Sequence, residues 1–211
     1  ELPLSGGETV RPQTPQWGKL LKRPGVKAAL TAFFFYSALE LTTGLWGSSY
    51  MVAVRGISPE TAAKWISLFY LGITAGRFFS GFLTLRFSDD AMVRLGEGTA
   101  IVGILLILLP LHNLFLCLGL ILTGLGCAPI YPSLLHATPQ RFGKSLSQSL
   151  MGTQMAISYL GSTTMPPVSG FLSEKISMGL YPILLLVFAL CMTILTEKGR
   201  HCTAELSLIH I

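Results

Sequence analysis

The chain has 211 residues, of which 51% are hydrophobic and only 12% are charged, and its mean hydropathy is +0.61. Soluble domains usually contain about 25% charged residues, so this chain has too few to cover the surface of a soluble fold. The net charge of +5 is modest, and the basic residues lie in short segments between apolar runs. This distribution excludes the clustered basic face of a nucleic-acid-binding protein.

The chain opens with a polar stretch rich in glycine and proline, ELPLSGGETVRPQTPQWG. It begins at Glu1 and shows no signal-peptide pattern. We interpret residues 1–27 as a linker that continues from a longer protein.

Six apolar segments follow the linker. A membrane helix needs about 20 mostly apolar residues to cross roughly 30 Å of hydrocarbon. The sequence therefore predicts an all-α, polytopic membrane protein, a six-helix transmembrane bundle over residues 28–196. Short polar connectors separate the segments, and Pro59, Pro110 and Pro139 are expected at helix edges. The predicted spans are Ala28 to Val54, Trp65 to Leu85, Leu95 to Leu111, Leu114 to His136, Leu146 to Leu172 and Met178 to Thr196.

The first span contains Glu40, about 18 Å of helix rise from Ala28 and thus near the bilayer middle. A carboxylate at that depth is costly and usually faces a cavity or a partner. Glu40 is therefore a candidate for substrate binding or proton coupling. The alternative is an interhelical ion pair or a protonated packing residue.

Aromatic residues with polar groups accompany Glu40. Trp46 and Tyr50 are four apart and share a helix face, and Tyr36 and Tyr131 lie in or near the spans. Such residues line the sites of small polar solutes. The alternative is the interfacial aromatic belt of membrane proteins, which suits Tyr50 well.

The second span contains Arg77, about 12 Å of rise from the end of the span at Leu85. Since the second helix runs antiparallel to the first, Glu40 and Arg77 differ in depth by only about 6 Å, which an Arg side chain can cover. The alternative is that Arg77 snorkels to the interface. Gly72 and Gly76 form a GxxxG pair, which predicts close helix packing.

The later spans carry fewer charges. Glu97 is expected near one end of the third span. Proline pairs interrupt the fourth and fifth spans, and they fit either helices that bend during transport or static kinks: Pro129, Pro132, Pro166 and Pro167. In the fifth span Gln154 and Ser158 share one face, which predicts either a cavity wall or a bond to a neighbouring helix. Residues 197–211 are expected to form a tail, whose end, Glu205 to Ile211, resembles read-through more than a natural terminus.

The connectors predict the orientation. The linker, the second and fourth connectors and the tail together hold 11 Lys and Arg residues, whereas the other connectors hold 3. Cytoplasmic loops are enriched in these residues, so both termini are expected in the cytoplasm and the protein in the plasma membrane. The alternative, six buried helices of a soluble bundle, does not predict alternating loop charge.

Metal and cofactor chemistry is not indicated. The four cysteines show no CxxC or Cys/His spacing, and we expect them to be packing residues: Cys117, Cys127, Cys191 and Cys202. We expect no cofactor and no metal site.

The stretch GRFFSGFLTLRF resembles the second copy of the loop signature of the major facilitator superfamily, with Gly81 and Arg86 matching its glycine and arginine. Leu85 stands where the first copy usually has aspartate. FYSALELTTGLWGSSYM, GLGCAPIYPSLL and GTQMAISYLGSTTMPP resemble the fucose-permease-like branch. The resemblance covers about residues 28–196. It implies the C-terminal half of a twelve-helix transporter, whose partners are the missing N-terminal six-helix half, the lipid bilayer and a small-molecule substrate.

This resemblance implies secondary active transport of a small solute such as a sugar, coupled to an ion or proton. Glu40 is then the coupling or binding carboxylate, Arg77 its partner, and Trp46, Gln154 and Tyr36 further site residues. Two alternatives are efflux of hydrophobic compounds by the same fold and a non-transporting receptor derived from it. An enzyme is not expected, because neither HExxH nor a GxSx motif is present.

Overall fold

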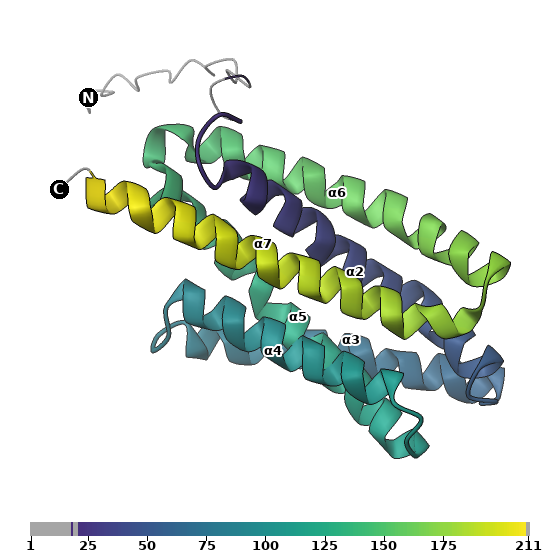
Figure 1. Cartoon of the computed structure of the whole chain (residues 1–211). Coiled ribbons are helices and arrows are strands. Elements are labelled where there is room, and N and C mark those ends of the chain that lie inside the picture. Colours follow the sequence, from purple (N-terminus) through teal and green to yellow (C-terminus); the bar gives the residue numbers. More distant parts are fainter. Residues whose placement is uncertain (1–17, 19–20, 210–211) are drawn as a thin grey trace, which may run out of the picture.

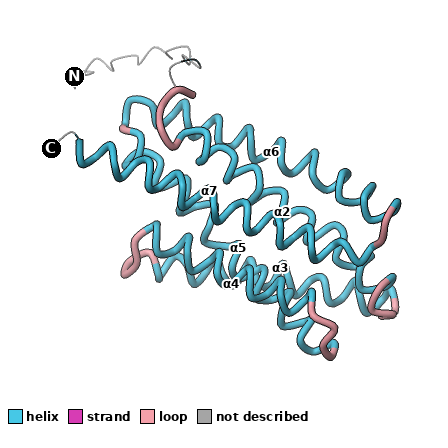
Figure 2. The backbone as a smooth tube through the Cα atoms, in the orientation of Figure 1, coloured by secondary structure: helices cyan, strands magenta, loops and turns pink. Residues whose placement is uncertain are grey.

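The computed structural model describes residue 18 and residues 21–209, and it is built from long helices (Figures 1 and 2). No strand occurs in this part of the chain. Helices are expected in lipid, because they satisfy their backbone hydrogen bonds internally. A short 3-10 turn, η1, precedes the last helix. The elements are α2 (Val26–Ala53), α3 (Pro59–Leu83), α4 (Asp89–Leu108), α5 (Asn113–Phe142), α6 (Lys144–Lys175), η1 (Met178–Leu180) and α7 (Tyr181–Ile209).

The helix starts follow from local sequence. Ser58 caps α3 by accepting a hydrogen bond from the Thr61 amide, and Pro59 occupies the first turn, where its missing N–H costs nothing. Ser88 caps α4 in the same way. Asp89 and Asp90 in the first turn of α4 favour its positive dipole end.

Several helices extend beyond the predicted spans, because polar residues near the membrane surface remain helical. The predicted connector over residues 137–145 shrinks to Gly143, whose φ of +88° suits glycine at a sharp turn. Pro139 therefore lies inside α5, although it was expected at a helix edge. Helix α4 begins at Asp89 because Ser88 caps it, and α7 continues through most of the predicted tail.

Proline does not interrupt the fourth or fifth helix. Helix α5 is continuous through Pro129 and Pro132, and α6 is continuous through Pro166 and Pro167. These prolines leave earlier carbonyls without their usual helical partner. In the same part of α6, the Trp46 indole donates to the Pro166 carbonyl.

The helices form two groups of three consecutive helices, α2 to α4 and α5 to α7, and the two groups pack into each other. Helix α5 packs against α3 and α4, while α2 packs against α6 and α7. The first helix of each group, α2 or α5, thus contacts the second and third helices of the other group. The third helices, α4 and α7, also contact each other. This reciprocal arrangement is that expected of an internal repeat in a transporter fold.

The predicted close packing at Gly72 and Gly76 is confirmed, with α5 as the partner. A Cβ atom on Gly72 would overlap the Ile121 carbonyl oxygen, and one on Gly76 would lie 2.6 Å from the Ala128 Cβ. Gly124 of α5 meets the backbone of α3 from the other side. The α3–α5 contact therefore depends on the absence of side chains.

Among the described residues, five helical segments are long and apolar enough to cross a membrane. They comprise α2, α3, α4, α5 and the segment from Met178 to Thr203. Helix α6 has the length but is rich in Ser, Thr and Gln. Its polarity is partly masked, because the hydroxyls of Thr163 and Thr164 donate to backbone carbonyls one turn earlier.

Candidate functional site

Glu40 and Arg77 meet on the surface of the bundle. The distance from Arg77 Nη2 to Glu40 Oε1 is 3.7 Å, and the exposed fractions of the side chains are 60% and 27%. The antiparallel run of α2 and α3 brings the two residues to similar depth, as their spacing from the span ends predicted. Arg77 is directed to its carboxylate partner and does not stand alone.

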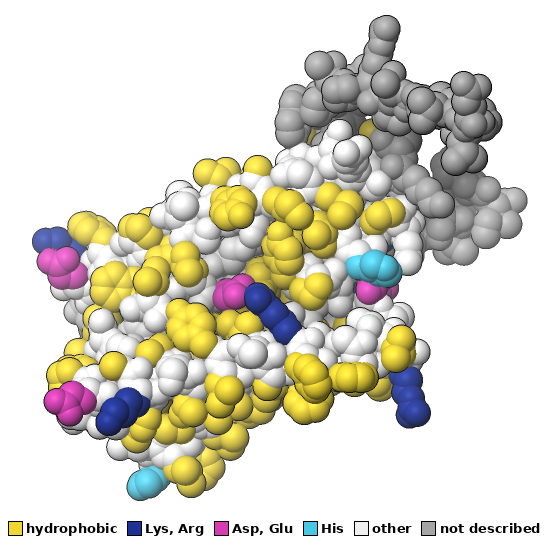
Figure 3. Space-filling view, turned by 180° about the vertical axis from the view of Figure 1, so that it is seen from behind, with side chains coloured by type: hydrophobic (Ala, Val, Ile, Leu, Met, Phe, Trp, Pro, Cys, Tyr) yellow, Lys and Arg dark blue, Asp and Glu magenta, His cyan; other side chains and the backbone are white. Residues whose placement is uncertain are grey.

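The pair lies on an apolar face. Figure 3 shows hydrophobic side chains spread widely over one side of the molecule, with few charged side chains among them. Aromatic residues of α3 are exposed, among them Phe78, Phe79 and Phe82. In a membrane protein, a charge pair away from the rim needs a protein or aqueous surrounding.

Tyrosines surround Glu40 on its inner side. Tyr36, one turn earlier on α2, is buried and interacts with the Glu40 side chain. Its ring packs on that of Tyr131 of α5, with a centroid separation of 5.7 Å, and Tyr131 meets Phe33 edge-on at 5.2 Å. The sequence-predicted residues Glu40, Arg77, Tyr36 and Tyr131 therefore form one cluster.

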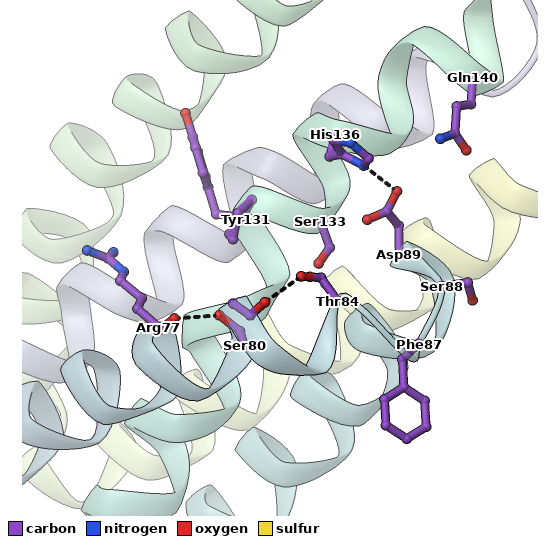
Figure 4. A pocket seen from close by; sticks show the side chains of 12 residues that line it. Arg77, Ser80, Thr84, Phe87, Ser88, Asp89, Tyr131, Ser133, His136 and Gln140 are labelled. Carbon is purple, nitrogen blue, oxygen red and sulfur yellow. Dashed lines mark hydrogen bonds and ion pairs between the residues drawn. The ribbon is translucent and has the colours of Figure 1, made fainter.

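A pocket of about 980 Å³ opens beside Arg77, between α3 and α5. Figure 4 shows Arg77 toward one end of this pocket and His136 toward the other, with Ser80, Thr84 and Ser133 between them. His136 Nδ1 lies 2.8 Å from Asp89 Oδ2. The wall therefore carries polar groups along its length on a mostly apolar surface, and it reaches the α3–α4 connector at Phe87 and Ser88.

Trp46 lies apart from this cluster, in the contact between α2 and α6. Its indole Nε1 donates to the Pro166 carbonyl at 2.8 Å, and the ring packs directly on Gly170. One edge lines a second hollow of about 480 Å³, near Phe171. Tyr50 is buried and donates to the Ile107 carbonyl at 3.2 Å, so it is no part of an interfacial belt.

Gln154 lies between helices and not on the wall of the large pocket. It is 1% exposed, and its amide oxygen accepts a hydrogen bond from Thr138 of α5 at 3.1 Å. Its face-mate Ser158 bonds to Ser37 of α2. Two roles were predicted for this face, a cavity wall or a bond to a neighbouring helix, and in the structure both residues bond to neighbouring helices.

The sequence interpretation missed a polar network between α4 and α7. Glu97 is 2% exposed, and it accepts a hydrogen bond from Thr196 at 2.7 Å. One turn away, Arg94 forms a two-pronged ion pair with Glu197, which also pairs with Arg200. The three-residue spacing of Arg94 and Glu97, matched by that of Glu197 and Arg200, was the available signal.

A second ion pair holds α4 to α5, since Asp90 bonds Arg141. Within the described residues, no group of three His, Cys, Asp or Glu side chains could hold a metal ion.

The comparisons with known proteins agree with the fold. The chain is 24% identical over 187 residues to Bypass of stop codon protein 6 of Saccharomyces cerevisiae, which covers 81% of this chain and 36% of the yeast protein. Its fold resembles the E. coli fucose:proton symporter FucP, with a TM-score of 0.68 and 20% identity over 88% of this chain and 44% of that one. FucP in the outward conformation gives a TM-score of 0.72 at 19% identity, with the same coverage.

The POT family transporter PepTSo gives a TM-score of 0.66 at 17% identity, over 82% of this chain and 37% of that one. The chain thus spans less than half the length of these proteins. The family model of the Major Facilitator Superfamily matches residues 28–201. Since this match covers most of the chain, the chain belongs to the Major Facilitator Superfamily.

Proposed function

We propose that the chain is the C-terminal half of a secondary active transporter that couples movement of a small polar solute, such as a sugar, to protons. The observation that carries this proposal is the Glu40–Arg77 pair beside the large pocket. A carboxylate at this depth takes up and releases a proton at low energetic cost only if a nearby group compensates its charge. Arg77 is that group.

The proposed substrate path lies between this half and an N-terminal half. The pocket beside Arg77 is open on one side, which suits a cavity completed by a second bundle. Ser80, Thr84 and His136 in its lining offer hydrogen-bonding groups to a polar solute. In the orientation that loop charge predicts, the pocket reaches the cytoplasmic connector at Phe87, and both termini are cytoplasmic in the plasma membrane.

The remaining site residues take supporting roles. Tyr36 orients Glu40 from the buried side. Trp46 fixes α6 against α2 through the Pro166 carbonyl. The assignment of Gln154 to the substrate cavity stays a prediction, since its amide is directed to Thr138 in this conformation.

The test is pH-driven uptake by the full-length protein that contains this chain, reconstituted in liposomes and assayed with radiolabelled sugars and sugar acids. Glu40→Gln, which keeps the hydrogen-bonding shape without the charge change, should retain measurable solute binding and lose the response to the pH gradient. Glu40→Ala should impair both, because it leaves Arg77 without a partner. Wild-type rates of pH-driven uptake in Glu40→Gln would reduce Glu40 to a packing residue.

A further inference from the structure

Arg77 is held loosely by its partner. The 3.7 Å separation from Glu40 exceeds hydrogen-bond range, and the Arg77 side chain, which lines the pocket, is 60% exposed. A guanidinium carries five N–H donors in a fork that matches the two oxygens of a carboxylate. Arg77 can therefore bind an acidic group of a ligand without first breaking a tight ion pair.

Two hydroxyl groups beside Arg77 present acceptors. Ser80 Oγ donates its hydrogen to the Arg77 carbonyl, and Thr84 Oγ1 donates to the Gly81 carbonyl, both at 2.9 Å. Because their hydrogens are directed to the backbone, their lone pairs remain for a ligand. Figure 4 marks both hydrogen bonds with dashed lines. The wall thus offers a cationic donor at Arg77 and acceptors suited to alcohol groups, one turn further along at Ser80 and about two turns further at Thr84.

The charge balance around Glu40 depends on one proton. The titratable groups that act on Glu40 are Tyr36 of the same helix, Arg77 of α3, and Cys127 and Tyr131 of α5. Arg77 is the cation of this set. While Glu40 is ionised, the pair is neutral; a proton on Glu40 leaves one uncompensated positive charge. An uncompensated charge inside a membrane protein is costly, and a bound monoanion removes that cost.

We infer that the solute is a hydroxylated carboxylic acid, bound through its carboxylate to Arg77 once Glu40 has taken up a proton. This inference rests on the proposed function and deepens it. One proton and one monoanion bind together, so the loaded site has the same net charge as the empty site with Glu40 ionised. A neutral sugar would leave the positive charge of Arg77 unpaired in the proton-loaded state.

The experiment measures binding by the purified full-length protein to probe pairs that differ in one carboxylate. The pairs are D-galacturonate with D-galactose and L-lactate with L-lactamide, each titrated at pH 5.5 and 7.5. In the wild type the carboxylate member should bind tighter by on the order of tenfold, with a larger preference at the lower pH. At both pH 5.5 and pH 7.5, Glu40→Gln should prefer the carboxylate member as strongly as the wild type does at pH 5.5.

Arg77→Gln should remove the preference for the carboxylate member, and Arg77→Lys, which keeps the charge without the fork, should retain part of it. Arg86→Gln, the same chemical change at an exposed position outside the pocket lining, is the matched control and should behave like the wild type. The His136–Asp89 pair is present in all of these variants alike, so Glu40→Gln isolates the contribution of Glu40.

Equal or tighter binding of the neutral members, or no binding of any carboxylate probe, would overturn the inference. So would a preference that Arg77→Gln and Arg86→Gln both keep. Uptake of galactose that depends on the pH gradient and on Glu40, without a carboxylate preference, would preserve the proposed function and overturn only this inference. A preference that depends on Arg77, without pH-driven uptake, would instead preserve the anion site and overturn the proton coupling.

Discussion

Replacement of Gly124 by alanine should destabilise the bundle, although alanine is the better helix former. The added Cβ would overlap the Phe69 carbonyl oxygen and lie 2.9 Å from the Ile73 amide nitrogen. Both are backbone atoms, so no side chain can rotate away, and α3 and α5 must separate. Overpacking of this kind costs about 1–3 kcal/mol, against a gain in helix propensity of about 1 kcal/mol.

Gly98→Ala is the matched control, because Gly98 is also helical and a Cβ there meets nothing within 4 Å. It should keep the propensity gain, so the two variants should differ by about 1–3 kcal/mol in the free energy of unfolding. At about 2–4 °C per kcal/mol, thermal denaturation of the detergent-solubilised protein should separate their Tm values by several degrees. An equal or higher Tm for Gly124→Ala would refute the close α3–α5 contact.

Three further predictions concern the helix contacts and the topology. Trp46→Phe removes the donor to the Pro166 carbonyl and should lower stability by about 1 kcal/mol, measured by thermal denaturation; an unchanged Tm would show that this hydrogen bond is dispensable. Glu97→Ala should cost about 1–3 kcal/mol in the same assay and Glu97→Gln clearly less, because the amide oxygen still accepts from Thr196; equal losses would contradict this. A membrane-impermeant thiol reagent should label Pro59→Cys only from outside and Phe87→Cys only from the cytoplasm, so labelling of both from one side would refute the predicted orientation.

The fold was largely predictable, because apolar length and loop charge are strong local signals. The ends of the helices were less predictable. Gly143 alone turns the chain between α5 and α6, and the polar residues before Gly143 are still helical. Hydropathy does not separate helix from connector where a helix extends beyond the hydrocarbon. Ser88 was the readable signal for the start of α4.

The contact between Glu40 and Arg77 was predictable, because the depth of the two residues decided it. Glu40 and Arg77 pair because antiparallel spans place them at one level. The neighbour that a polar residue faces depends on how its helix is rotated about its own axis, and a single sequence does not specify this rotation. Gln154 therefore lies between helices, and Glu97, expected near a span end, is buried against Thr196 of a helix distant in sequence.

The central claim is that Glu40 carries the coupling proton. It is tested most directly by comparing two fluxes in Glu40→Gln liposomes loaded with the radiolabelled probes: exchange of solute against solute, and accumulation driven by a pH gradient. Exchange requires substrate binding and alternating access but no net proton movement. The account predicts that exchange persists while accumulation falls to the level seen without a gradient. Accumulation at the wild-type level, or loss of both fluxes in a stably folded variant, would contradict it.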